Sequence, residues 1–247
     1  MDKRDNSSAH RRVVEDYYRV TSASGAASSA AMYEEAVRGL ERRLAHWLDV
    51  INLDVVDLGS GTGELCALAQ RKGARSVVGI NLSEEESEFA SKFVDAEFAA
   101  MDIREYLEKA APGSVDRIFA LNILEHLDKD TLLKVLEEAY RCLRPGGALV
   151  AMVPNATSPF GNMTRYWDIT HQLAFTPSSV RQLSRMAGFG ESAGFRECGP
   201  VPHGLVSGIR FLLWRCIRFL VKGYLMVELA SDKGGVYTAD MMFRLSK

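Results

Sequence analysis

The chain has 247 residues, and 47% of them are hydrophobic, which suffices for one main domain with a substantial core. Its 30 Lys and Arg residues against 32 Asp and Glu residues give a net charge of -2, which excludes an overall positive field for a nucleic-acid partner. The four cysteines include no C-x-x-C pair, which argues against a zinc site or a disulfide framework and indicates reduced, mostly buried thiols.

The first 50 residues are predicted to form helices in front of the main domain. The polar N-terminus has no apolar core of the kind that a signal peptide needs, so we expect a cytoplasmic protein. A first helix is expected over Arg12–Arg19. The small-residue stretch 21–30 has little reason to be ordered alone, and we expect a mobile lid there. Apolar residues recur at helical spacing over Tyr33–Leu48, which predicts a helix that lies against a sheet.

From Asp54 onward, predicted strands and helices alternate, which predicts βαβ units, right-handed connections and a parallel sheet. The predicted strands are Val55–Leu58, Ser76–Ile80, Ala96–Met101, Val115–Leu121, Ala148–Val153, Phe195–Cys198 and Tyr237–Leu245. The helices predicted among the first five strands are Gly63–Lys72, Glu84–Val94 and Lys129–Leu143. Pro145 and the glycines after it end the last of these helices. A later helix begins at Pro177, behind the capping residue Thr176. The two last strands are expected to complete the sheet with an antiparallel edge.

A glycine-rich turn is the most informative motif. Residues 57–63 read D-L-G-S-G-T-G, after the apolar strand and before the apolar helix that contains Leu65. Glycines let a ligand approach the backbone closely, and the new helix offers unpaired N–H groups. The turn therefore predicts a nucleotide-like cofactor. The glycines alternate instead of following G-x-G-x-x-G, which points away from NAD.

The spacing D-x-G-x-G-x-G resembles the first motif of class I S-adenosylmethionine (SAM) methyltransferases. The resemblance implies an α/β, Rossmann-like fold with a mostly parallel seven-stranded sheet and helices on both faces, here with an added helical C-terminal region. It also implies SAM as cofactor and S-adenosylhomocysteine as product. The cofactor contacts that it implies in the turn are Asp57, Gly59, Ser60, Gly61 and Gly63. The alternative is a tight strand-to-helix connection without a ligand.

The resemblance places further cofactor contacts at the ends of the next strands. In that family an acidic residue after the second strand binds both ribose hydroxyls, whereas this chain has Asn81, followed by Leu82. An amide lacks the charge assistance of a carboxylate. After the third strand, the resemblance assigns Asp102 to the adenine amino group, and Met101 and Ile103 to the faces of the ring. Alternatively, Asp102 caps a helix that begins at Ile103.

The fourth strand is followed by I-L-E-H at residues 123–126, which resembles a segment of many small-molecule and sugar methyltransferases. By this resemblance Asn122 lies near the cofactor sulfur and His126 is a catalytic candidate; alternatively, His126 merely starts the next helix. The tetrapeptide N/D-P-P-Y/F is absent, which argues against DNA-adenine and protein-glutamine methylation. His126, Asp128 and Asp130 cluster in the sequence as metal ligands do, but the hydrophilic start of a helix explains them as well, so we assign no metal.

Residues 153–189 are long for a connection and mix aromatic with polar side chains, which suits a binding segment. The pattern R-Y-x-D-x-T-H-x-x-x-F-T at residues 165–176 resembles bacterial methyltransferases that are encoded with polysaccharide and O-antigen assembly. The resemblance implies a saccharide or glycan hydroxyl as the methyl acceptor. A small secondary metabolite, such as a phenol or a polyketide, is the alternative.

His171 is the leading candidate for a general base. An alcohol is a poor nucleophile at neutral pH, so its proton must leave as the methyl group is transferred in line. Asp168 is expected to orient the ring, and Arg165 to bind a sugar, a carboxylate or a phosphate. The flat aromatic faces that are expected to stack on a sugar are those of Tyr166, Trp167 and Phe160. Alternatively, Arg165, Asp168 and His171 form an ion-pair network that holds the loop.

The segment 205–229 is strongly apolar but contains four cations, so we reject a transmembrane helix. At helical spacing, Arg215, Arg218 and Lys222 share one sector, and Arg210 lies beyond its edge. Such a helix either rests on an anionic membrane surface, as at the inner membrane, or packs on protein, for example in a homodimer.

The sequence predicts three segments. Residues 1–50 contain the N-terminal helices and lid, residues 51–155 the SAM-binding core, and residues 156–247 the acceptor-binding segment, the apolar and basic helix and the final strands. The predicted function is a SAM-dependent O-methyltransferase. The alternative from another class is a catalytically silent SAM-fold subunit, for which Asn81 in place of an acid is the best argument; a NAD-dependent oxidoreductase is the third choice.

Overall fold

A computed structural model describes residues 30–191, 193–232 and 234–247. The helix predicted at 12–19 and residues 21–29 of the predicted lid lie outside the described residues. The first described helix, α2 (Ala30–Leu44), continues into a short 3-10 helix, η1 (Ala45–Trp47). Together they match the helix that the apolar spacing predicts.

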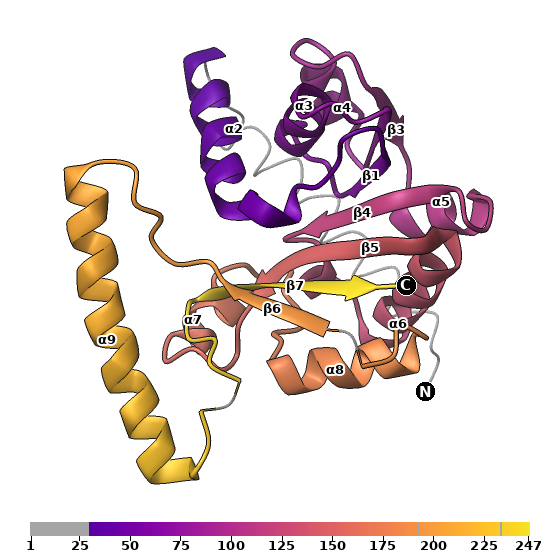
Figure 1. Ribbon diagram of the computed structural model, residues 1–247. Coiled ribbons are helices and arrows are strands. Elements are labelled where there is room, and N and C mark those ends of the chain that lie inside the picture. Colours follow the sequence, from indigo (N-terminus) through magenta and orange to yellow (C-terminus); the bar gives the residue numbers. More distant parts are fainter. Residues whose placement is uncertain (1–29, 192, 233) are drawn as a thin grey trace.

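The described residues contain a seven-stranded sheet in the order β3-β2-β1-β4-β5-β7-β6 (Figure 1). Its strands are β1 (Asp54–Leu58), β2 (Ser76–Asn81), β3 (Glu97–Ala100), β4 (Val115–Leu121), β5 (Leu143–Pro154), β6 (Ala193–Glu197) and β7 (Asp240–Ser246). The first five strands are parallel, and β7 runs antiparallel to both of its neighbours. The predicted fold and the antiparallel edge are therefore confirmed.

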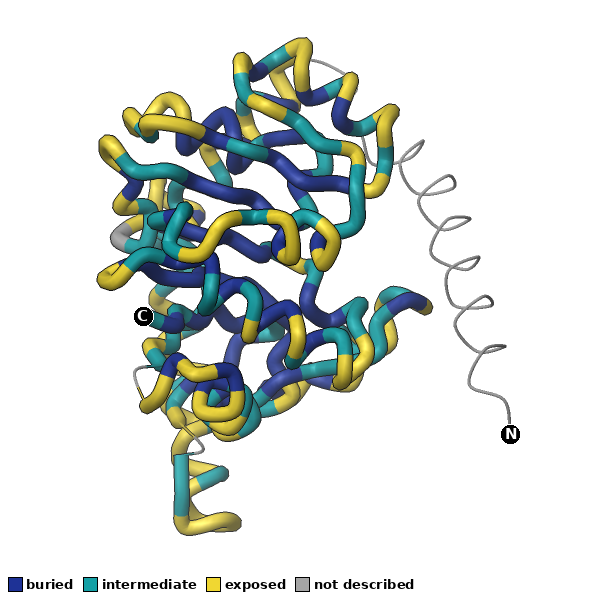
Figure 2. Tube along the Cα trace, turned by 90° about the vertical axis from the view of Figure 1, so that its right-hand side faces the viewer, coloured by how far each residue is buried: buried dark blue, intermediate teal, exposed yellow. Residues whose placement is uncertain are grey.

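Helices cover both faces of the sheet. Besides α2, the helices around the sheet are α3 (Glu64–Arg71), α4 (Glu84–Ala90), α5 (Ile103–Lys109), α6 (Lys129–Cys142), α7 (Gly161–Tyr166) and α8 (Pro177–Met186). Neighbouring strand residues face opposite ways. Val56 packs with residues of α5, α6 and α8, whereas Val55 packs with residues of α2 and α3. The buried stretches follow the strands (Figure 2).

The segment 153–189 contains more helix than expected, because α7 forms within the predicted loop. The helix α8 begins as predicted, with Thr176 and Ser179 in a capping box and Pro177 in the first turn. The helix α6 ends at Cys142, and β5 begins at once; the pairing of β4 with β5 shifts across residues 144–147. The glycines after Pro145 thus form a bulge inside a strand instead of a loop between elements.

An ion-pair network holds the amino ends of the central strands. The carboxylates of Asp54 and Asp116 share the guanidinium groups of Arg75 and Arg144 at N···O distances of 2.6–3.2 Å. The hydrogen bond from Arg75 is the main reason that the pKa of Asp54 lies well below its usual range. Structural contacts therefore occupy the amino ends of the central strands, and the predicted site lies at their carboxyl ends.

The helix α9 (Leu205–Leu229) stands beside the β6–β7 edge of the sheet (Figure 1). Most of its large apolar side chains are exposed, including Leu213 and Leu220. Among the described helices, none has the length and apolarity that crossing a membrane requires.

Candidate functional site

The turn between β1 and α3 has the backbone that only glycine adopts easily. Gly61 has φ +49° and Gly63 has φ +84°, and Gly63 caps α3. A Cβ at Gly63 would lie 2.8 Å from the Cβ of Ala90, so this position is also closed by packing. A Cβ at Gly61 would meet nothing within 4 Å. The middle of the turn thus leaves open space above the backbone.

Two polar side chains are buried beneath this turn. Asp57 is 3% exposed, and burial raises its pKa to about 7. The Cys66 thiol donates to its carboxylate at 3.8 Å. The hydroxyl oxygen of Ser60 is buried and has no hydrogen-bond partner within the described part of the chain. A buried, unpaired hydroxyl is costly, so Ser60 fits a ligand that supplies the missing bond.

Asn81 at the end of β2 is buried beside a carboxylate that sequence reasoning missed. Its Nδ2 donates to Oε2 of Glu86 at 2.6 Å. Glu86 lies in the first turn of α4, where its backbone N–H bonds the side chain of the capping residue Ser83. The capping pattern S-x-x-E at residues 83–86 was the available signal. The chain therefore places a carboxylate next to the neutral residue where an acid was expected.

Asp102 caps α5, as the alternative interpretation predicts. Its carboxylate accepts from the Arg104 backbone N–H at 2.8 Å and forms an ion pair with the Arg104 guanidinium at 2.8 Å. Ile103 is buried and Met101 is half-buried beside it. The adenine contacts of these residues stay a prediction.

Leu82 and Asn122 follow the ends of β2 and β4, and both are exposed. The backbone of Asn122 has φ +55°, a conformation that asparagine tolerates better than most residues. Its backbone N–H donates to the carbonyl of Met152 at 2.9 Å. Asn122 is exposed just after the carboxyl end of β4. The position of its side chain near the cofactor sulfur stays a prediction.

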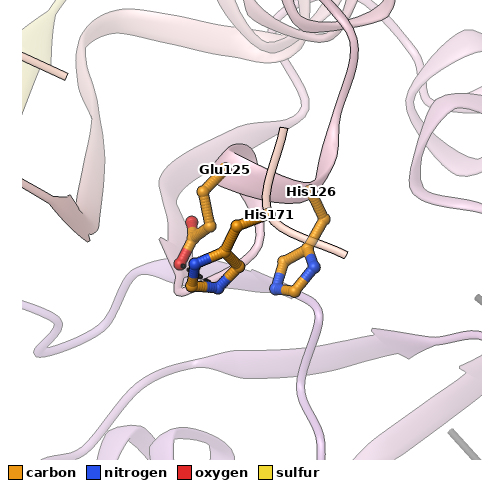
Figure 3. A group of neighbouring side chains, drawn as sticks. All are labelled: Glu125, His126 and His171. Atoms are coloured by element: carbon orange, nitrogen blue, oxygen red, sulfur yellow. Dashed lines mark ion pairs between the residues drawn. The ribbon is translucent and has the colours of Figure 1, made fainter. Parts of the chain in front are cut away.

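The structure brings Glu125, His126 and His171 together at the carboxyl end of β4 (Figure 3). Glu125 and His126 belong to a short 3-10 helix, η2 (Leu124–His126). The two imidazole rings meet edge to face with centroids 4.8 Å apart. The Oε1 atom of Glu125 lies 3.9 Å from Nε2 of His171. The catalytic candidates His126 and His171 are thus neighbours, and Glu125 joins them although it was not among the predicted site residues.

Glu125 is 1% exposed, and burial raises its pKa to about 8. Its Oε2 atom is buried without a hydrogen-bond partner among the described residues. Its backbone carbonyl accepts hydrogen bonds from the N–H groups of Gln172 and Leu173. The loop that contains His171 is therefore attached to η2 by backbone bonds.

Asp168 does not orient His171, contrary to expectation. It accepts from the backbone N–H and the hydroxyl of Thr170 at 2.8 and 2.6 Å. The Thr170 oxygen lies 2.7 Å from Nδ1 of His126, so Asp168 acts on His126 through Thr170. Nδ1 of His171 is instead 3.0 Å from the carbonyl oxygen of Thr164.

Arg165 holds the loop, as the alternative interpretation predicts, although through the backbone and not through an ion pair. Its guanidinium donates to the carbonyls of His171 and Gln172 and lies 5.2 Å from the ring centroid of Tyr166. The three aromatic side chains predicted to bind the acceptor are 64–79% exposed. They are Phe160, Tyr166 and Trp167.

The acids near His126 in the sequence have structural roles. Asp128 caps α6 by accepting from the backbone N–H of Thr131 at 2.8 Å, and this bond lowers its pKa. Asp130 lies in the first turn of the same helix, where a negative charge is favourable.

Residues 55–147 match the family described as a methyltransferase domain. Over 110 residues, which is 38% of this chain, the sequence is 43% identical to an arsenite methyltransferase of Aquipseudomonas alcaligenes. Over 129 residues, which is 49% of this chain, it is 33% identical to the methyltransferase GfsG of Streptomyces halstedii. These matches span 31% and 45% of the two relatives, so less than half of either.

The fold is shared with a SAM-dependent methyltransferase from Archaeoglobus fulgidus, at a TM-score of 0.64 and 19% identity. The match covers 87% of this chain and 94% of that one. Residues 55–147 therefore match a methyltransferase domain, and the chain has the fold of a SAM-dependent methyltransferase. SAM is accordingly the cofactor that we expect. The open space at Gly61 and the unpaired hydroxyl of Ser60 fit such a ligand.

We expect Glu86 to supply the carboxylate that binds the ribose. Glu86→Gln is expected to weaken SAM binding about tenfold, because a charge-assisted hydrogen bond becomes a neutral one. Calorimetry with SAM and S-adenosylhomocysteine measures this, with Glu88→Gln on the exposed face of α4 as the matched control. Wild-type affinity in Glu86→Gln would assign the ribose contact elsewhere, and undetectable binding of both ligands to the wild type would favour a silent subunit.

We expect Asp57→Asn to raise the Tm of the cofactor-free protein in a pH-dependent way. An unfolded Asp ionises near pH 3.9, whereas the folded pKa of Asp57 is about 7. As the pH rises between these two values, the Asp57 carboxyl ionises in the unfolded chain but not in the folded one, which increasingly lowers the free energy of unfolding. Asparagine does not ionise and so removes this cost. The gain in Tm is expected to grow from pH 5 to pH 7 and to level off above. A gain that is the same at every pH would contradict this explanation.

Proposed function

We propose that this chain is a SAM-dependent O-methyltransferase whose acceptor hydroxyl binds over Glu125, His126 and His171. The observation that carries the proposal is the close packing of the cofactor turn on Ile123, which lies just before this cluster in the chain. A Cβ at Gly59 would lie 3.0 Å from Cγ1 of Ile123, two residues before Glu125. The strands β1 and β4 are also parallel neighbours, so their carboxyl ends meet at one edge.

When bound, SAM supplies a methyl group activated on a sulfonium. The chain must hold the acceptor oxygen in line and promote loss of its proton. The Thr164 carbonyl only accepts, so Nδ1 of His171 carries the hydrogen and Nε2 carries the lone pair. In the simplest form of the proposal, Nε2 of His171 takes the hydroxyl proton itself.

A saccharide or glycan hydroxyl is the acceptor that we favour. Tyr166, Trp167 and Phe160 are exposed on the segment that carries His171, and flat aromatic faces stack well on sugars. This supports the resemblance of residues 165–176 to glycan-associated methyltransferases.

The acceptor named for the relative from Aquipseudomonas alcaligenes, arsenite, fits this site poorly. Soft ions prefer thiolate ligands. The cluster offers imidazole and carboxylate groups and contains no cysteine; Cys66 and Cys142 are buried in the core, and the exposed Cys216 lies on α9. We therefore favour an oxygen acceptor over arsenic.

We expect methyl transfer from labelled SAM to a panel of saccharides to depend on His171. His171→Ala is expected to lower kcat by about 10²–10⁴-fold with little change in SAM affinity, because general base catalysis contributes in this range. His203→Ala is the control, since His203 is exposed and the Nδ1 atom of its ring lies 2.9 Å from the backbone carbonyl oxygen of the nearby Val201. Full turnover in His171→Ala would remove His171 from the mechanism, and transfer to phenols alone would overturn the saccharide assignment.

We also propose that α9 packs on a second copy of the chain. Two of its four cations are already paired within the chain, Arg218 with Glu197 at 2.7 Å and Lys222 with Asp232 at 3.8 Å. This weakens the cationic face that an anionic membrane would need. The apolar surface remains: Leu213 is 59% and Leu220 is 69% exposed. An exposed apolar surface of this kind favours a protein partner.

Light scattering after size exclusion tests this surface. The wild type is expected to be dimeric, and Leu213→Glu with Leu220→Glu monomeric, because buried charges oppose association. Ile51→Glu is the control, since Ile51 is an exposed apolar residue outside α9. A monomeric wild type that floats with anionic liposomes at low salt would contradict the proposal and favour a membrane surface.

A further inference from the structure

We propose that Glu125, His126 and His171 bind a divalent transition-metal ion that activates the acceptor hydroxyl; this rests on the proposed methyl transfer. One ligand atom of each residue lies within 4.8 Å of the others (Figure 3). Ligand atoms bound at about 2.1 Å to one ion lie roughly 3–3.5 Å apart, so the most distant pair needs to close by about 1.5 Å. Small rotations of the side chains achieve this.

Both imidazole rings are oriented in the way that metal-binding histidines usually are. Metal-binding histidines usually donate their other ring N–H to a carbonyl, a carboxylate or a similar acceptor. Nδ1 of His171 faces the carbonyl of Thr164, which can only accept. The Thr170 hydroxyl donates to Asp168, so it accepts from Nδ1 of His126. Both rings are therefore held in the tautomer whose Nε2 lone pair binds a metal.

Glu125 supplies an independent indication of a missing cation. Its side chain is 1% exposed, and its Oε2 atom lacks a hydrogen-bond partner in the described ranges. The other carboxylate oxygen of Glu125, Oε1, lies 3.9 Å from Nε2 of His171. A buried carboxylate in such surroundings is costly unless a cation or donors satisfy it. A metal ion between Glu125 and the two rings provides that charge.

The ligand set selects the class of metal. Two imidazoles and one carboxylate suit zinc, iron or manganese, whereas magnesium and calcium prefer oxygen ligands alone. Three protein ligands leave open positions, as in catalytic sites. The residues Asp128 and Asp130, considered with His126 in the sequence, cap and begin α6 instead, so the metal site uses different partners from those the sequence brings together.

The ion changes how the acceptor proton leaves. A hydroxyl bound to a divalent metal ionises far more easily, as metal-bound water does. The hydroxyl proton passes to solvent, the oxygen forms a bond to the methyl carbon, and the carbon–sulfur bond breaks with its electron pair kept by sulfur, which gives S-adenosylhomocysteine. No electron is gained or lost by the metal. His171 then acts as a ligand and not as the proton acceptor.

Metal binding by the full chain tests the proposal without any acceptor. After treatment with a chelator, calorimetry with Zn²⁺, Mn²⁺ and Mg²⁺ is expected to show one site for Zn²⁺ or Mn²⁺ and much weaker binding of Mg²⁺. Glu125→Gln and His126→Ala are expected to abolish that site. Thr170→Val leaves the ligands in place and is expected to weaken binding about 10–100-fold through the lost contact to His126. His203→Ala and Asp130→Asn are the controls and are expected to bind as the wild type.

The outcomes separate this proposal from the proposed function. Absence of stoichiometric binding of Zn²⁺ and Mn²⁺, or binding that Glu125→Gln and His126→Ala leave unchanged, overturns the metal site. If methyl transfer then persists and depends on His171, the proposal that His171 itself takes the hydroxyl proton still stands. If the metal binds as expected but no saccharide or phenol accepts a methyl group, the metal site stands and the proposed function fails.

Discussion

The structure depends on one contact, the packing of the glycine turn against the loop after β4. Gly59 lies so close to Ile123 that an added Cβ would be 3.0 Å away, and its backbone has φ +78°. Because β1 and β4 are parallel neighbours, their carboxyl ends bring the cofactor turn and the acceptor cluster to one edge. The backbone of the cofactor turn thus packs on the side chain of Ile123, which lies two residues before the cluster.

The acceptor segment is held to the same edge by backbone bonds. The N–H groups of Gln172 and Leu173 bind the carbonyl of Glu125, and the guanidinium of Arg165 binds carbonyls of the same loop. His171 therefore has a fixed position relative to Glu125 without an ion pair on its own segment. The exposed aromatic residues around Tyr166 are not held in this way, which suits side chains that contact a variable acceptor.

Local signals were sufficient to predict the fold and the cofactor turn. The alternation of strands and helices and the glycine spacing are properties of short segments, and they gave the sheet and the turn correctly. The partners of the catalytic candidates were not predictable in this way. His126 is held by Thr170, 44 residues away, and His171 by a carbonyl of α7, a helix of only six residues. Glu125 gained its importance from burial, which no single segment reveals.

The central claim is that the glycine turn and the cluster form one active site. A crystal structure of the chain with S-adenosylhomocysteine tests it most directly. We expect the ribose at the end of β2 and the sulfur on the side of Glu125, His126 and His171. A ligand bound away from the turn, or with its sulfur directed away from this cluster, would contradict the account.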